Sequence, residues 1–102
     1  MANAGTLLCS AQANGTSTAV AFGSESLNIR KSQLRSLFVT GTWDSATFKL
    51  QASADGGTTY VDVVGADSIT VNKLVNVEVR CTHFRCVVSG GGGSESITTR
   101  LV

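Results

Sequence analysis

The sequence contains few charges, no proline and a single histidine, and the scarcity of charge narrows the classes of protein it can belong to. Charged residues make up 15% of the 102 residues and the net charge is +1, whereas about 25% is usual in soluble domains. Without a basic surface, the chain lacks the attraction that nucleic acid or an anionic membrane requires. A surface rich in neutral residues favours instead a protein that functions inside an assembly.

Long apolar runs are also absent, since no segment approaches the roughly 18 residues of a transmembrane helix. The first ten residues, MANAGTLLCS, carry no positive charge, and their apolar run is limited to Leu7 and Leu8, so they do not resemble a signal peptide. We therefore expect a chain that stays in the cytoplasm or in a particle assembled there. Three cysteines in a reducing compartment are expected to be free thiols.

The single histidine, His83, limits the chemistry that the chain can perform. Its spacing from the other polar residues specifies no Ser/His/Asp or Cys/His/Asp set, so we expect neither an enzyme nor a cofactor. Cys81 and Cys86 flank His83, but they would face opposite sides of a continuous strand. A zinc site would need a fourth ligand, for which Cys9 is the only other soft candidate. We expect no metal, with a Cys81–Cys86 disulfide as the alternative to buried thiols.

Acidic residues and glycines are concentrated at predicted turns. An aspartate in a turn commonly accepts hydrogen bonds from its own backbone, which is our interpretation of Asp44, Asp55, Asp62 and Asp67. Their spacing matches no compact Ca²⁺ loop. The four glycines at 90–93 lack the Lys-Ser/Thr that follows a phosphate-binding loop, so we expect a mobile turn.

Alternation of polar and apolar residues is the strongest pattern present. In TFKLQAS, at 47–53, every second residue is apolar, which predicts a strand. Asp55-Gly56-Gly57 supplies residues suited to a tight turn, and alternation resumes to Val64, so we predict a β-hairpin. Its predicted core face comprises Phe48, Leu50, Val61 and Val63. Its predicted outer face comprises Lys49, Gln51, Tyr60 and Asp62.

The remaining strands are predicted by the same rule, at 16–23, 33–41, 68–71, 74–82, 84–89 and 96–102. The residues expected to face inward include Thr18, Val20, Phe22, Ile69, Val71, Val77, Phe84, Cys86, Val88, Ile97, Thr99 and Leu101. Such a pattern is typical of an antiparallel sandwich or barrel. We predict a single all-β domain, a jelly-roll-like antiparallel β-sandwich of about eight short strands, over 16–102. Residues 1–15 are interpreted as an N-terminal arm or a first edge strand, and the domain is expected to fold without residues 1–13.

Residues 41–63, GTWDSATFKLQASADGGTTYVDV, resemble a recurring pattern in small virion proteins of tailed bacteriophages. The pattern is Gly-Thr-Trp, an Ala-Thr-apolar-x-Leu-Gln strand, and Ser-x-Asp-Gly-Gly-Thr-Thr before an aromatic residue and Asp-Val. The run FRCVVSGGG at 84–92 is similar to the closing strands of such proteins, and the resemblance covers about half of the chain. Tyr60 stands where Trp is usual, and the pair Cys81 and Cys86 is atypical.

The resemblance implies a structural protein of the virion, assembled in the host cytoplasm, and the size of the chain favours a capsid decoration (cement) protein. It would bind the major capsid protein as a homo-oligomer, expected to be a trimer, without nucleic acid or membrane. The expected contact residues lie in the arm and at two exposed tips: Leu7, Leu8, Trp43, Asp55, Gly56, Gly57 and Tyr60. The alternative is a carbohydrate-binding β-sandwich of a phage tail or fibre, with Trp43, Tyr60 and Asp62 near the sugar.

Overall fold

Nine β-strands are the regular elements of the described part of the chain, which comprises residues 6–21, 34–79 and 81–102 of the computed structural model. They are β1 (Thr6–Gln12), β2 (Gly15–Thr16), β3 (Val20–Ala21), β4 (Leu34–Thr42), β5 (Thr47–Ser53), β6 (Val61–Asp62), β7 (Lys73–Glu78), β8 (His83–Ser89) and β9 (Ser96–Leu101). All their pairings are antiparallel. Within these residues there is no helix that could cross a membrane.

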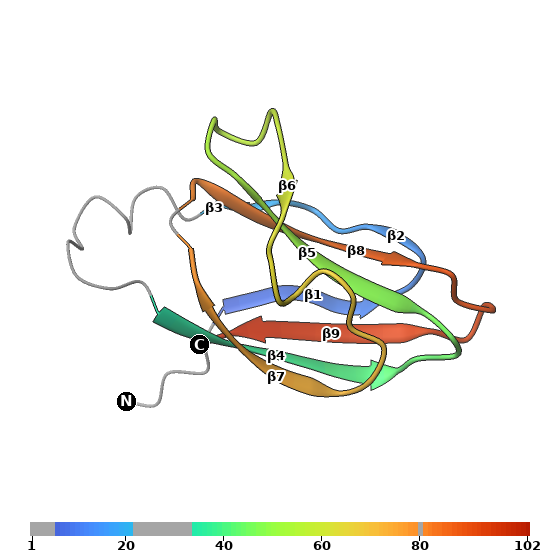
Figure 1. Cartoon of the computed structure of the whole chain (residues 1–102). Coiled ribbons are helices and arrows are strands. Elements are labelled where there is room, and N and C mark those ends of the chain that lie inside the picture. Colours follow the sequence, from blue (N-terminus) through green and yellow to red (C-terminus); the bar gives the residue numbers. More distant parts are fainter. Residues whose placement is uncertain (1–5, 22–33, 80) are drawn as a thin grey trace.

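The strands form two sheets that pack face to face (Figure 1). One sheet has the order β1-β9-β4-β7, and in the other β8 lies between β5, which continues to β6, and an edge made of β2 and β3. β2 and β3 pair with opposite ends of β8, so together they act as one interrupted edge strand. With that edge counted once, every connection except that between β5 and β6 passes from one sheet to the other, which is jelly-roll connectivity. The prediction of an antiparallel, jelly-roll-like β-sandwich is confirmed.

The core consists of alternate residues of the central strands, as their sequence pattern predicts. Phe48 and Leu50 of β5 are fully buried, and each contributes roughly 1.5–3 kcal/mol through removal of its side chain from water. Facing them across the sandwich are alternate residues of β4 and β9, and beside them those of β8. The fully buried side chains of these strands are Leu37, Val39, Phe84, Cys86, Val88, Ile97, Thr99 and Leu101.

The N-terminal segment is a strand of the sandwich over residues 6–12. β1 pairs with β9 along its length, from Thr6↔Leu101 to Gln12↔Ile97, with two irregularities in register. Leu8 is 4% exposed and lies in the core beside Cys9. Of the two interpretations of residues 1–15, the edge strand describes this part, and Leu8 is unavailable for the partner contact expected of it.

The second half of the predicted hairpin differs from the sequence pattern. Of the strand predicted to follow the turn, only β6 (Val61–Asp62) is formed, and it pairs with β5 at Gln51↔Asp62 and Ala52↔Val61. Val61 is 68% exposed, so its predicted place in the core is wrong: β6 is an edge strand, and Val61 lies where the sandwich is open at the side. Val63 is buried as predicted.

Three other predicted strands are shorter than their alternation suggests, and one of them, predicted over 74–82, ends at Glu78. The strand at 68–71 is reduced to a bridge between Ile69 and Phe48; Ile69 is buried, but Val71 is 61% exposed, because the chain leaves the sheet after the bridge. Thr18, predicted to face inward, is exposed, because it lies in the interruption between β2 and β3. Phe22 and the predicted strand position 33 fall outside the described residues.

Candidate functional site

Trp43 lies at the corner where β4 passes to β5, in a tight turn. Ala46 N donates to Trp43 O at 2.6 Å, and the two central residues, Asp44 and Ser45, both have positive φ, as in a type I′ turn. The indole is half-buried against the core, and its Nε1 donates to Asn72 Oδ1 at 2.9 Å. The Trp43 ring is thus held in place by contacts within its own chain.

The tip between β5 and β6 is organised by Asp55. Its Oδ1 accepts from Thr59 N at 2.9 Å, from Thr58 N at 3.2 Å and from Ser53 Oγ at 2.8 Å. Gly56 and Gly57 both adopt positive φ, as predicted from their sequence. The hydrogen bond from the Thr59 backbone, followed by that from Ser53, lowers the pKa of Asp55 to about 2. Asp55 therefore shapes the tip, in agreement with its interpretation as a turn residue.

Because the pKa of Asp55 is lowered in the fold, we expect the stability of the protein to depend on pH. Because Asp55 titrates at about 2 in the fold and at an ordinary value of 3.8 otherwise, its stabilising effect is fully present above pH 3.8 and is lost as the pH falls towards 2. Between pH 5 and pH 2 we expect the melting temperature of the wild type to fall further than that of Asp55→Asn, as measured by circular dichroism. Parallel pH profiles would show that Asp55 is not held as described.

A polar network covers the outer face of β5, β6 and β8. Asp62 accepts a hydrogen bond from Gln51 Nε2 at 2.8 Å and lies 3.5 Å from Lys49 Nζ. Both contacts lower the pKa of Asp62, and the hydrogen bond from Gln51 has the larger effect. Gln51 Oε1 in turn accepts from Arg85 Nε at 2.7 Å, and the Arg85 guanidinium stacks on the ring of Tyr60, 3.8 Å from its centre. The outward orientation predicted for Lys49, Gln51, Tyr60 and Asp62 is therefore correct.

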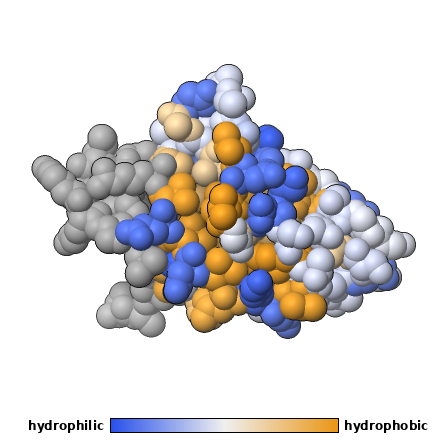
Figure 2. Space-filling view, in the orientation of Figure 1, coloured by the Kyte–Doolittle hydropathy of each residue, from blue (hydrophilic) through white to orange (hydrophobic). Residues whose placement is uncertain are grey.

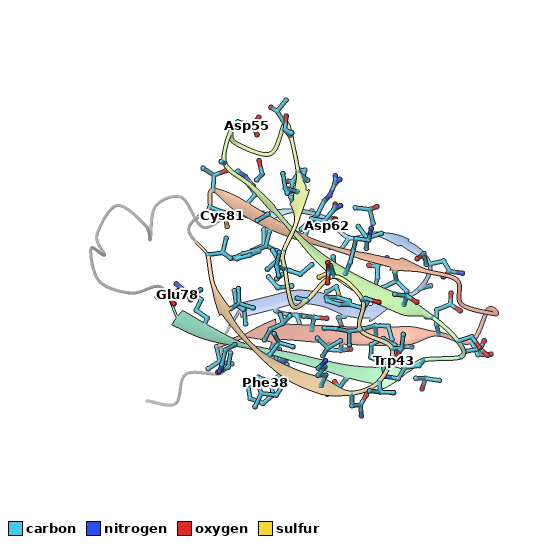
Figure 3. All side chains as sticks on the ribbon, viewed as in Figure 1. Phe38, Trp43, Asp55, Asp62, Glu78 and Cys81 are labelled. Carbon is cyan, nitrogen blue, oxygen red and sulfur yellow. The ribbon has the colours of Figure 1, made fainter. Side chains whose placement is uncertain are left out.

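The aromatic residues of the predicted sugar site are not brought together. Trp43 precedes the start of β5, whereas Tyr60 adjoins Val61, which pairs with Ala52 near the other end of that strand. At about 3.3 Å per residue, the two lie on the order of 15 Å apart along the strand, and Figure 3 shows Trp43 well separated from Asp62 and from the Asp55 tip. One face of Tyr60 is already covered by Arg85.

The glycine turn between β8 and β9 is held by hydrogen bonds, contrary to the expectation of a mobile turn. Glu95 is 7% exposed, and its carboxylate accepts from Asn14 N at 2.9 Å and Gly93 N at 2.7 Å. The bond from Asn14 contributes most to lowering the pKa of Glu95. Asp44 accepts from Ser94 N at 2.9 Å, and Asn14 exchanges two bonds with Gly91. The turn between β8 and β9 is therefore hydrogen-bonded to two other connections, the one between β1 and β2 through Asn14 and the one between β4 and β5 through Asp44.

The cysteines are free thiols, as predicted, but their arrangement was not. Cys9 of β1 and Cys86 of β8 meet between the two sheets, and contact with Cys9 together with burial raises the pKa of Cys86. Burial raises the pKa of Cys81 to about 11. Both Cys81 and Cys86 are therefore protonated and weakly nucleophilic at neutral pH. Among the described residues, no group of three potential ligands is placed to hold a metal ion.

Seven large apolar side chains are exposed in the described chain: Leu7, Phe38, Val61, Val64, Val71, Leu74 and Val102. Most gather in two places. Leu7, Phe38 and Leu74 lie on the outer face of the four-stranded sheet, and Val61 and Val64 border the open side between β6 and β7. Figure 2 shows hydrophobic surface in the middle of the visible face and along its lower edge.

The sequence prediction placed contact residues in the N-terminal arm, at Leu7 and Leu8, and at the tips, and it did not single out Phe38, Leu74 and Arg100 on the outer face of the four-stranded sheet. Alternation along β4 could have shown Phe38 opposite to the buried Leu37 and Val39, but the pairing that brings Arg100 beside it depends on the sheet order.

Comparison with models of protein families found no match, and neither did comparison with curated proteins or with solved structures.

Proposed function

We propose that this chain is a bacteriophage capsid decoration protein that binds the major capsid protein lattice as a homo-oligomer, expected to be a trimer, and stabilises the virion shell. The observation that carries the proposal is the number of exposed large apolar side chains on a jelly-roll domain with 15% charged residues. Apolar surfaces gathered in this way mark contacts with other proteins. Jelly rolls are common in viral capsid proteins, which is an argument from fold analogy alone.

The described side chains suit a building block better than a catalyst. Asp55 and Glu95, whose pKa values are lowered, accept structural hydrogen bonds from the backbone: Asp55 within its own turn, and Glu95 from Asn14 of another connection and from Gly93 of its own turn. Cys81 and Cys86 are protonated because their pKa values are raised, and Cys9, whose pKa is lowered to about 7 by its contact with Cys86, is buried between the two sheets. The carbohydrate-binding alternative receives no support from the geometry, since Trp43 is fixed to Asn72 at a distance from Tyr60.

Stabilisation of a shell by such a protein follows from selective binding. A protein that binds only the assembled, expanded lattice stabilises it by RT ln(1 + [L]/Kd) at each site, or about 2.7 kcal/mol when the free protein is at 100 times Kd. An oligomer that reaches several capsid subunits at once increases the effect through effective concentration. Neither mechanism needs nucleic acid, a membrane or a cofactor.

The test is co-sedimentation of the purified full chain with expanded, emptied capsids of the phage whose genome encodes it. We expect saturable binding and a higher melting temperature of the capsids, measured by scanning calorimetry, and a gene adjacent to that of the major capsid protein. Absence of binding, together with binding to a glycan array that is lost in Trp43→Ala, would contradict the proposal and favour the tail-associated alternative.

A further inference from the structure

A row of residues crosses the outer face of the four-stranded sheet from edge to edge. Arg100 of β9 is the register partner of Leu7 on β1 and of Phe38 on β4, and Phe38 is the partner of Leu74 on β7. Directly paired residues have neighbouring side chains, so one cation lies within an apolar row. We call this row the sheet surface. Phe38 is 43% exposed and points away from the sandwich in Figure 3, and no ion pair among the described residues involves Arg100.

A second surface lies on the open side of the sandwich, between β6 and β7. There a hollow of about 390 Å³ is lined by valines of both edges, among them Val61, Val64 and Val79. Asp62 and Glu78 also line it, so the ionisable residues of its lining are acidic, although Asp62 already contacts Lys49. Val64 is 92% exposed, and the Asp62 side chain is 42% exposed in spite of its contact with Lys49. We call this surface the side hollow.

The geometry points to a head-to-tail contact between copies of this chain, in which Phe38 of one copy enters the side hollow of the next and Arg100 lies against Asp62. The two surfaces match in chemistry, since each is apolar and the charge of one is opposite to that of the other. A carboxylate has about four acceptor positions, so Asp62 can bind a further donor. An aromatic side chain in a hollow, with an arginine beside it, is a common centre of strong interfaces.

The charges also favour this contact over a symmetric one. Two sheet surfaces packed against each other across a twofold axis would bring their Arg100 residues together, and like charges repel. In the side hollow, Glu78 already has a partner in its own chain, so Asp62 is the carboxylate that we assign to Arg100. A contact between two different surfaces instead leaves the side hollow free on one copy and the sheet surface free on the other, so further copies can add, and a ring forms when the rotation closes. The inference rests on the homo-oligomer within the proposed function and assigns its contact surfaces.

The experiment measures self-association of the full chain by sedimentation equilibrium over a concentration series. We expect the wild type to associate, and Arg100→Glu and Val64→Lys each to weaken association at least tenfold, since each places like charges together. Combining them should restore association, because the introduced carboxylate would then face the introduced ammonium group across the contact. Thr18→Lys adds the same charge as Val64→Lys at an exposed site on the opposite edge, and it should associate like the wild type.

Phe38→Ala gives a second measurement that involves no charge, and it should also weaken association. A monomeric wild type at all concentrations, or unchanged association in the single variants, would overturn the inference. So would a double variant no better than the singles. Because no capsid is present, these outcomes are separate from the co-sedimentation test: the contact can be right where capsid binding fails, and a monomer that binds capsids would refute only the contact.

Discussion

Addition of one methyl group at Gly41 is expected to destabilise the sandwich by about 2–5 kcal/mol, a large part of the stability of a domain of this size. Gly41 lies in β4 opposite Ile97 of β9, and a Cβ there would overlap the carbonyl oxygen of Ser96 and approach Ile97 Cα to 3.0 Å. Both contacts are with backbone, so relief requires separation of two central strands. The φ of +147° adds to the cost of Gly41→Ala.

Gly65→Ala is the matched control, because it separates backbone conformation from steric overlap. Gly65 also has positive φ, +90°, but nothing lies within 4 Å of a Cβ built there. We expect it to cost only the conformational part, about 1–2 kcal/mol. Urea denaturation of the two variants gives the comparison, with unchanged m values required for a valid difference. Equal losses would show that the close approach of β4 and β9 is not what requires glycine at position 41.

The strands that the sequence predicts best are those at the centres of the sheets. In β5, β8 and β9 each second residue is buried or nearly so, because both neighbours of the strand are present and the opposite sheet covers it. The rule fails at Val61 and Val71, which lie at an edge and beyond a single bridge, where no opposite sheet covers the side chain. Local alternation shows that a strand exists, but it does not show whether anything lies over it.

The surfaces proposed for contact depend on register, which local sequence does not contain. Phe38 and Arg100 are far apart along the chain, and they become neighbours only because β4 pairs with β9. The meeting of Cys9 with Cys86 likewise requires β1 and β8 to lie in opposite sheets. The turn at Asp55 was predictable because the hydrogen bonds that Asp55 accepts all come from within a few residues of it.

Removal of residues 1–13 is expected to abolish cooperative unfolding, which reverses the expectation from the sequence. The truncation deletes β1, so β9 loses a partner strand and the core loses Leu8 and Cys9. Loss of one buried leucine side chain alone costs about 2–5 kcal/mol, and the stability of a domain is about 5–15 kcal/mol. Circular dichroism melting should show a broad, non-cooperative transition for the truncated chain.

Adjacent leucines in β1 provide a test of the reason for that loss. Leu8 is 4% exposed and Leu7 is 41% exposed on the opposite side of the same strand. Leu8→Ala should cost about 2–5 kcal/mol by urea denaturation, whereas Leu7→Ala should cost less than about 1 kcal/mol, as is usual for exposed positions. If the truncated chain instead melts cooperatively at the wild-type temperature, β1 is an arm that the domain can release. The exposed Leu7 would then be part of a segment available for pairing with a neighbouring subunit, as the sequence first suggested.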